Sequence, residues 1–383
     1  MGFATQLIPQ IRTLPVSSTC GVAVPANRIV RLSFAIAAAA TRLCANPALL
    51  SAQSLSVNST SVSTDGASSY LARSLTPAQI SADLTQLRQA LEQVHAGYDR
   101  YVPRRVMDTA FARLGKRAEK AMTDVELYRE IALLLAKIRC GHTKAELPQA
   151  LADYREKNAT MLPVRVRVFG ARLFVAASGA VGAGKIAVGT EITSINGISA
   201  ADIITKLSRF AAVDGFTDFS RATLLERDGD LIGSDLDHYW PIEFGFASQW
   251  TIALKTAAGV TRTVSLAPLT KPKWTALTGD VPQIDFRNGT RLKMLDDTTA
   301  TLTIRSFVNY RTPVNIDSLY TSAFAQLKTK RVRHLIIDLR DNGGGSDDAS
   351  SGLIRYVADR PVQPLKSVRR RTIRIDSALS AGF

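Results

Sequence analysis

The 383-residue sequence is poor in cysteine and histidine, and it has no acidic residue before Asp65. Three cysteines are too few for a disulfide scaffold, and so small an odd number indicates little about the redox compartment. No apolar run reaches the about 20 residues of a membrane-spanning helix. Apolar residues make up 46% and charged residues 21% of the chain, which excludes an intrinsically disordered protein. At about 150 residues per domain, the length predicts two or three folding units.

Basic residues outnumber acidic ones. The chain has 48 Lys and Arg and 33 Asp and Glu, which gives a net charge of +15. They are scattered, with small clusters within 116–120, 328–333 and 366–371. No zinc-finger spacing, RNA-binding signature or basic-zipper pattern accompanies them. We therefore interpret them as solvated surface and expect no nucleic-acid partner. Salt-sensitive binding of nucleic acid is the weaker alternative.

Residues 1–70 differ in composition from the rest of the chain. Arg28 and Arg31 precede the apolar stretch from Leu32 to Ala40, and a Ser-rich run follows it. This order is typical of an export signal, and a disordered leader is an equally good interpretation. If the stretch is a signal, we expect the protein in the periplasm or outside the cell. The stretch is too short to span a membrane as a helix.

Residues 74–150 carry helical patterns. Thr76-Pro77-Ala78-Gln79 has the capping hydroxyl, proline and glutamine of a helix start, and Thr123-Asp124-Val125-Glu126 is a second capping box. Apolar residues follow each start at spacings of three and four, and a further helix is expected at 106–120. We predict a helical N-terminal domain whose last helix ends before Gly141.

Residues 160–270 change to the period of β-strands. Val164, Val166 and Val168 alternate with arginines, and a buried strand runs into the turn Asn196-Gly197. A helix is expected at 199–210, and two more strands at 250–254 and 261–266. The order of strand, Asn-Gly turn and helix resembles a PDZ-type peptide-binding domain.

Residues 283–383 contain the most informative pattern. A strand at 299–304, a helix at 316–327 and an apolar strand at 334–339 predict one right-handed crossover with parallel strands. The second strand leads into Asp338-Leu-Arg-Asp-Asn-Gly-Gly-Gly-Ser346, and a helix follows at 349–356. The fold class expected for the whole chain is therefore α/β within an α+β multidomain protein.

The glycine run is open to several interpretations from the residues alone. A phosphate loop would need Gly-Lys-Ser/Thr, and a dinucleotide turn would need G-x-G-x-x-G; both are missing. Backbone N–H groups at the end of a strand can instead form an oxyanion hole for acyl transfer. A turn that merely needs glycines is the remaining interpretation.

The order of a helical unit ending in Gly141-His142-Thr143, a PDZ-like segment and the Asp338–Gly345 motif resembles the tail-specific, or carboxyl-terminal processing, serine peptidases of family S41. The tricorn-core branch is the nearest in pattern. The resemblance implies oxyanion-hole N–H groups at Gly344 and Gly345, His142 as general base, and structural roles for Asp338 and Arg340. It also implies a crotonase-like α/β layer, polypeptide substrates or C-terminal peptide tails as partners, and no cofactor or metal.

Three candidate residues have simpler interpretations beside the functional ones. His142 follows a helix end, where a histidine is often a cap or a surface residue. Cys140 can be imagined as a thiol nucleophile paired with His142, but a buried core cysteine is the favoured interpretation. Ser346 ends the glycine run and is a possible nucleophile, although the family resemblance places the nucleophile further along the chain.

The sequence departs from the family pattern after Ser346. The resemblance implies a Ser-Ala-x-Glu-like segment at the start of a later helix, followed by a Lys or Glu partner. Ser377 and Ser380 are followed by neither. We therefore expect a serine peptidase by descent whose chain is truncated before its nucleophile and has negligible activity alone. The alternative is a non-catalytic protein that binds peptides or another ligand on the same fold.

Overall fold

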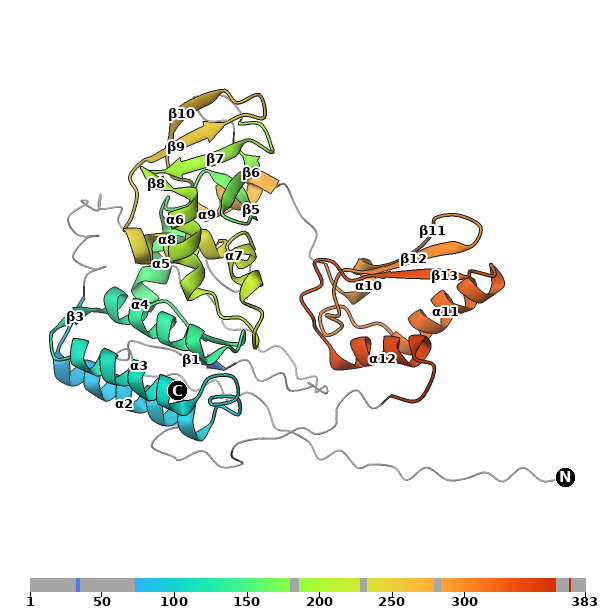
Figure 1. Ribbon diagram of the computed structural model, residues 1–383, viewed down its shortest axis with the longest axis horizontal. Coiled ribbons are helices and arrows are strands. Elements are labelled where there is room, and N and C mark those ends of the chain that lie inside the picture. Colours follow the sequence, from blue (N-terminus) through green and yellow to red (C-terminus); the bar gives the residue numbers. More distant parts are fainter. Residues whose placement is uncertain are drawn as a thin grey trace, which may run out of the picture.

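The computed structural model describes residues 32–34, 73–179, 186–227, 233–278, 284–362 and 372. Its buried apolar side chains form two separate clusters, one between Leu75 and Leu266 and one between Phe286 and Leu353. Figure 1 shows a larger body that extends from β2 to α9 and a smaller body that extends from α10 to α12. Both bodies mix helices and sheets, which confirms the mixed α and β architecture.

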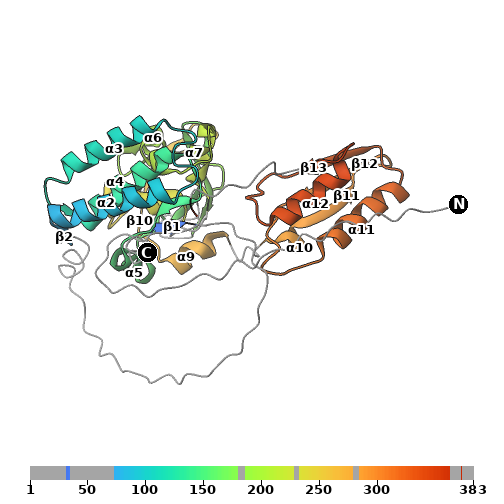
Figure 2. The ribbon, with the colours of Figure 1, turned by 90° about the horizontal axis from the view of Figure 1, so that it is seen from below.

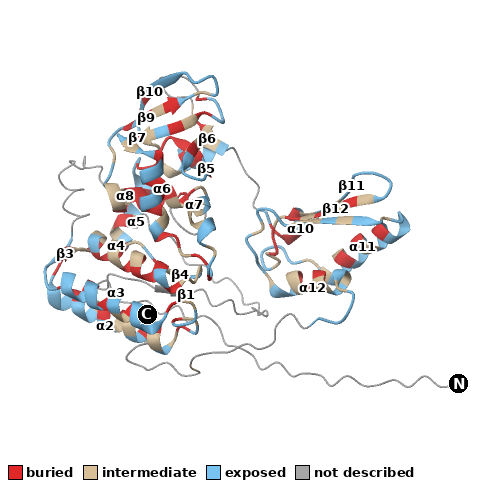
Figure 3. Cartoon of the chain, in the orientation of Figure 1, coloured by how far each residue is buried: buried red, intermediate tan, exposed pale blue. Residues whose placement is uncertain are grey.

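The larger body begins with helices that pack against one another. The elements of this region are β2 (Ser74–Leu75), α2 (Pro77–Gln93), α3 (Arg104–Arg117), β3 (Met122–Thr123), α4 (Asp124–Leu135), η1 (Ala136–Ile138), β4 (Thr143–Ala145) and α5 (Gln149–Lys157). Thr76 and Thr123 form the predicted capping boxes with Gln79 and Glu126. Figure 3 shows exposed residues along α2 and α3 and many buried ones on α4, which therefore lies inside this body.

A short strand, β1 (Leu32–Phe34), pairs antiparallel with β4. It coincides with the start of the apolar stretch that resembles an export signal. The rest of that stretch lies outside the described residues, so the export signal stays a prediction.

A six-stranded antiparallel sheet forms the other side of the larger body, in the order β10-β9-β7-β6-β5 with β8 beside β7. Its strands are β5 (Val164–Phe169), β6 (Arg172–Ser178), β7 (Glu191–Ile195), β8 (Ile198–Ser199), β9 (Trp250–Lys255) and β10 (Thr261–Leu266). Asn196 and Gly197 make the predicted turn between β7 and β8, with φ of 49° and 78°. The helices are α6 (Ala200–Leu207), η2 (Ser208–Phe210), η3 (Asp218–Ser220), α7 (Arg221–Leu224), α8 (Asp235–Phe244), α9 (Lys271–Thr275) and η4 (Ala276–Thr278).

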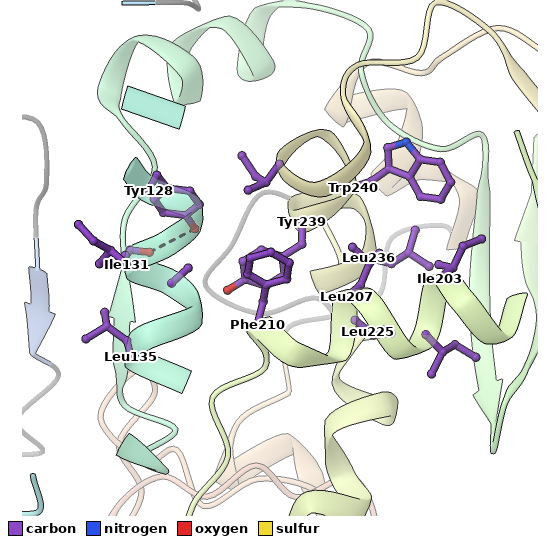
Figure 4. Close-up of a cluster of buried hydrophobic side chains, with 14 of the residues drawn as sticks. Tyr128, Ile131, Leu135, Ile203, Leu207, Phe210, Leu225, Leu236, Tyr239 and Trp240 are labelled. Atoms are coloured by element: carbon purple, nitrogen blue, oxygen red, sulfur yellow. Dashed lines mark hydrogen bonds between the residues drawn. The ribbon is translucent and has the colours of Figure 1, made fainter. Parts of the chain in front are cut away.

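One hydrophobic core joins the helices to this sheet. Side chains of α4, α6, η2 and α8 meet in it (Figure 4). Phe210 stacks on Tyr239 with ring centroids 4.7 Å apart, and Trp240 packs edge-on against Trp250 at 5.0 Å. Because such pairs bury large apolar areas, we expect residues 74–150 and 160–270 to unfold together.

The smaller body is a three-stranded sheet in the order β11-β12-β13. Its elements are α10 (Phe286–Gly289), β11 (Thr290–Met294), β12 (Thr299–Ile304), α11 (Ile316–Thr329), β13 (His334–Asp338) and α12 (Asp347–Val357). Strands β12 and β13 are parallel and α11 connects them, as the sequence predicts. Helices α11 and α12 lie side by side on one face of the sheet (Figures 1 and 2). The loop between β13 and α12 carries the glycine motif.

Candidate active site

His142 lies in the tight turn that follows η1. Arg139 has a φ of 62°, which ends the helix, and the Thr143 N–H donates to the Cys140 carbonyl at 3.1 Å. The His142 side chain is exposed, and among the described residues its ring makes no hydrogen bond. This ring is therefore accessible and able to accept a proton from a bound molecule.

The segment 211–220, called the strap below, holds this turn from one side. The Gly215 N–H donates to the Arg139 carbonyl at 3.0 Å, and Arg139 Nη1 donates to the Gly215 carbonyl at 2.8 Å. Arg139 also pairs with Asp218 at 2.8 Å, and its guanidinium lies 5.1 Å from the centre of the Phe216 ring. These contacts fix the strap to the residue that precedes Cys140.

The strap brings a carboxylate to His142. Asp214 Oδ1 accepts a hydrogen bond from the Gly141 N–H at 2.7 Å. A sulfur of Cys140, a ring nitrogen of His142 and a carboxylate oxygen of Asp214 all lie within 4.8 Å of one another. Cys140 is half-buried and packs against the edge of the core, so it is both a core-contacting cysteine and a member of this cluster. Asp214 has no motif around it, and sequence reasoning missed it.

The loop Asp338–Gly345, called the glycine loop below, starts with an ion pair inside the motif. Arg340 donates from Nε and Nη2 to the two carboxylate oxygens of Asp338, at 2.9 and 2.8 Å. The Arg340 backbone N–H adds a bond of 3.1 Å to the same carboxylate. These donors hold the pKa of Asp338 well below its usual range. The two residues therefore fix the first part of the loop against each other.

The middle of the glycine loop is tied to β12 and to itself. Asn342 Nδ2 donates to the Ile304 carbonyl at 2.9 Å, and Asn342 Oδ1 accepts from the Gly344 N–H at 2.8 Å. Asp341, which has a positive φ of 64°, pairs with Arg305 at 2.8 Å. The polar residues of the motif thus set the path of the backbone before the last glycines.

Gly344 and Gly345 differ in what their N–H groups do. The Gly344 N–H is occupied by Asn342, and its carbonyl accepts from the Phe307 N–H at 2.9 Å. The Gly345 N–H has no acceptor among the described residues. A Cβ on Gly345 would lie 2.2 Å from backbone atoms of Phe307 and Val308, so only glycine fits there. Of the two sequence-predicted donors, Gly345 has the N–H that is open to a ligand.

Ser346 is the N-cap residue of α12 and lies beside the glycines. Its N–H donates to the Phe307 carbonyl at 2.8 Å, and its Oγ accepts from the Asn309 N–H at 3.2 Å. No described histidine hydrogen-bonds to this hydroxyl. The two later candidates, Ser377 and Ser380, lie outside the described residues.

The other histidines have different surroundings from His142. His95 is buried, its Nδ1 accepts from the Gly97 N–H at 3.1 Å, and its Nε2 lies 2.8 Å from Thr143 Oγ1. Burial lowers the pKa of His238, whose Nε2 lies 2.8 Å from the Tyr128 hydroxyl. His334 is exposed at the start of β13. Only His142 is both exposed and part of a cluster with a carboxylate and a thiol among the described residues.

A buried polar group inside the larger body was not apparent from the sequence. Arg155, which is fully buried, donates to the carbonyls of Asp237 and His238 at 2.7 and 3.1 Å. The Asp237 carboxylate accepts from the Leu162 N–H at 2.9 Å and from the Ser234 hydroxyl at 2.6 Å. Burial nevertheless raises the pKa of Asp237 to about 6. These contacts fasten α8 to α5 and to the segment before β5, which indicates a structural role.

A groove of about 980 Å³ lies between α3, α4 and the residues around η2. Apolar side chains such as Val106, Leu114 and Leu133 line it, together with seven basic residues and one acidic residue. The basic residues are Arg105, Arg113, Arg117, Lys137, Arg139, Arg209 and Arg221. Four of them, Arg105, Arg113, Lys137 and Arg209, have no ion-pair partner among the described residues. Since Arg139 belongs both to the groove and to the turn of His142, the two features adjoin.

The structure therefore places the predicted site residues in two groups. His142 lies with Cys140 and Asp214 in the larger body, and Gly344 and Gly345 lie in the smaller one. The larger body approaches the glycine loop through Arg227, whose Nη2 lies 3.2 Å from the place that a Cβ on Gly343 would take.

A comparison with known protein families finds a match in the smaller body. Residues 298–379 match the family model described as Peptidase family S41, and this range includes β12, α11, β13, the glycine loop and α12. The similarity to peptidase family S41 therefore lies in the C-terminal unit. The predicted family is thereby confirmed for the segment that carries the glycine motif.

Three solved structures of CPAF are similar to between 71% and 74% of the chain. Mature CPAF complexed with lactacystin has a TM-score of 0.47 and 13% identity, with 74% of this chain and 60% of that chain covered. Mature CPAF and its S499A mutant give TM-scores of 0.39 and 0.41, at 14% and 13% identity, each over 71% of this chain. The matched regions make up 56% of mature CPAF and 57% of the mutant. The chain therefore spans less than two thirds of the length of each of the three CPAF structures. No curated protein matches the sequence.

None of the described helices has the length and apolar character that crossing a bilayer requires.

Proposed function

We propose that the protein is a serine-type peptidase of the tail-specific kind, which cleaves peptide bonds through an acyl-enzyme. The observation that carries this proposal is the glycine loop of the smaller body, which Asp338, Arg340 and Asn342 hold in one path while the Gly345 N–H stays open. A fixed N–H donor at the end of a strand suits the developing negative charge of a tetrahedral intermediate.

The roles follow from the chemistry of acyl transfer. A serine hydroxyl attacks the substrate carbonyl, His142 accepts its proton, and the Gly345 N–H stabilises the oxyanion. His142 then returns the proton to the leaving amine, and water hydrolyses the acyl-enzyme by the same route. Gly344 becomes a second donor once Asn342 Oδ1 releases its N–H. One such donor contributes about 3 kcal/mol to the stability of the transition state.

We further propose that Ser346 is not the nucleophile. Its hydroxyl accepts from Asn309 and its backbone N–H pairs with Phe307, so it fixes the start of α12. The proposed base, His142, lies in the other body. In this proposal the nucleophilic serine is missing from the described residues, and these residues alone have negligible peptidase activity.

The test is to treat the protein isolated from its native source with a fluorophosphonate and to locate the modified serine by mass spectrometry. We expect one modified serine other than Ser346, unchanged in Ser346→Ala and lost in His142→Ala. Modification of Ser346 would overturn the assignment of the nucleophile. Absence of any modified serine, or equal modification in His142→Ala, would overturn the proposed mechanism.

The alternative, a protein that binds peptides without cleaving them, is favoured by one observation. The groove beside α3 and α4 combines an apolar lining with four unpaired basic side chains among the described residues, which suits an acidic peptide. Calorimetric titration with acidic and neutral peptides of equal length tests it. We expect preference for the acidic peptide and its loss in Arg105→Glu with Arg113→Glu; equal binding of both peptides would contradict the alternative.

A further inference from the structure

We propose that Cys140, His142 and Asp214 bind a divalent ion of the zinc type. Their sulfur, ring nitrogen and carboxylate oxygen lie within 4.8 Å of one another, and they form the only cluster of this kind among the described residues. Thiolate, imidazole and carboxylate are the three ligand types that Zn²⁺ takes in proteins. Harder ions such as Mg²⁺ and Ca²⁺ prefer oxygen ligands alone.

The spacing of the three groups needs only a small adjustment. Zn²⁺ binds sulfur at about 2.3 Å and nitrogen or oxygen at about 2.0 Å, so neighbouring ligand atoms of a tetrahedral ion lie about 3.5 Å apart. The side chains that would make this adjustment, His142 and Asp214, are both exposed. Three protein ligands leave a fourth position for water or for another ligand.

The backbone around the cluster is held in place before any ion binds. Cys140 and His142 flank Gly141, whose N–H donates to Asp214 Oδ1 at 2.7 Å. The Thr217 hydroxyl donates to the Asp214 carbonyl at 2.8 Å, and Gly215 is bonded to Arg139 in both directions. Such supporting contacts orient metal ligands and raise affinity. The nearby Arg139 charge is paired with Asp218, which limits its repulsion of a cation.

Occupation of this site would switch off the proposed base. A metal-bound ring nitrogen has no lone pair with which to accept a proton, so His142 would serve either the ion or the substrate. This regulatory consequence rests on the proposed peptidase function, whereas the metal site itself does not. We therefore infer that zinc-type ions inhibit the peptidase by binding to its base.

The test is Co²⁺ titration of a Cys20→Ser, Cys44→Ser background, in which Cys140 is the sole thiol. We expect one Co²⁺ per chain with a thiolate charge-transfer band. The band should vanish in Cys140→Ser, and affinity should fall by roughly tenfold or more in His142→Gln and Asp214→Asn. Asp214→Asn keeps an oxygen for Gly141, and circular dichroism verifies that each variant folds. As a matched control, His334→Gln, which changes the exposed histidine of β13, should bind like the background.

Absence of binding, or a thiolate band that persists in Cys140→Ser, would overturn the metal site. The Co²⁺ titrations do not measure hydrolysis. A negative titration therefore does not affect the peptidase proposal, and a protein without peptidase activity can still have the metal site. For the regulatory step, we expect Zn²⁺ to abolish cleavage by the native protein and a chelator to restore it. Full activity with the ion bound would overturn that step alone.

Discussion

Asn342 Oδ1 accepts a hydrogen bond from the Gly344 N–H at 2.8 Å, and this bond gives two neighbouring glycines different roles. Gly344 is fixed by the side chain of its own loop. Gly345 is fixed by the backbone of the adjacent segment, because a Cβ there would lie 2.2 Å from Phe307 and Val308. The open N–H thus belongs to Gly345, which is the glycine of the two that cannot accept a side chain.

The first prediction compares alanine at these two positions. Gly345→Ala should destabilise the smaller body by about 3 kcal/mol or more, because it combines a clash with the backbone and an unfavourable φ of 142°. Gly344→Ala meets no atom within 4 Å, so only its φ of 102° counts and the loss should be about 1–2 kcal/mol. Urea unfolding followed by far-ultraviolet circular dichroism measures both, and equal midpoints for the two variants would contradict this account of the loop.

The second prediction concerns the two hydrophobic cores. All three tryptophans, Trp240, Trp250 and Trp274, are buried in the larger body. Gly345→Ala should therefore leave the unfolding midpoint measured by tryptophan fluorescence unchanged. Phe210→Ala should lower that midpoint, because the larger body loses a stacked ring of its core at a cost of about 3–5 kcal/mol. A fluorescence midpoint that moves in Gly345→Ala would show that the two bodies unfold as one.

The third prediction is a pH dependence that arises from Asp237. Its folded pKa of about 6 lies above the about 3.9 of an unfolded Asp, so the folded state holds this proton more strongly. Its contribution to the free energy of unfolding should fall as pH rises from about 4 to 6 and stay constant above that range. The stability of the wild type relative to Asp237→Asn should thus decrease by roughly 2–3 kcal/mol across this window.

Asp237→Asn is a suitable comparison because an amide can replace both hydrogen bonds to Leu162 and Ser234. Asp338 acts in the opposite direction, since its lowered pKa adds stability as pH rises through the acid range. That contribution is common to both proteins and cancels in the difference. A difference that is constant from pH 4 to pH 7 would contradict the burial of a protonatable Asp237.

The fourth prediction tests the strap. Arg139→Ala removes the bonds to Gly215 and Asp218 without removing a metal ligand. Amide exchange in 213–218 should become faster, and Co²⁺ affinity should fall severalfold, because Asp214 loses its support. Arg129→Ala, which breaks the ion pair between Arg129 of α4 and Glu243 of α8, is the control and should leave Co²⁺ binding unchanged. Unchanged affinity in Arg139→Ala would show that the strap does not position Asp214.

Local signals in the sequence were sufficient for much of the fold. The capping boxes at Thr76 and Thr123, the Asn196-Gly197 turn and the crossover from β12 through α11 to β13 are each encoded within a few residues or one apolar period. Helix α8 was missed because it contains Pro241 and buries two polar residues, Asp237 and His238, which tertiary contacts satisfy. Leu236, Tyr239 and Trp240 do follow helical spacing, but the buried polar residues between them and the proline after them obscure this pattern.

Residues of the candidate site could be predicted from the sequence only where they belong to a recognisable motif. His142 and the glycine loop could be located from Gly-His-Thr and from the Asp338–Gly345 pattern. Asp214 could not, since the strap reaches His142 only through the folding of a distant segment onto Arg139. The preference for the Gly345 N–H over that of Gly344 depends on where one side chain, Asn342, places its amide oxygen.

Peptide hydrolysis by the native protein tests the central proposal most directly, with His142→Gln compared against His334→Gln. Loss of a general base lowers the rate by about 10²–10⁴-fold. We expect cleavage of an unfolded polypeptide to fall by at least about 10²-fold in His142→Gln and to be unchanged in His334→Gln. Cleavage by His142→Gln at the wild-type rate would contradict the role of His142 and, with it, the proposed mechanism.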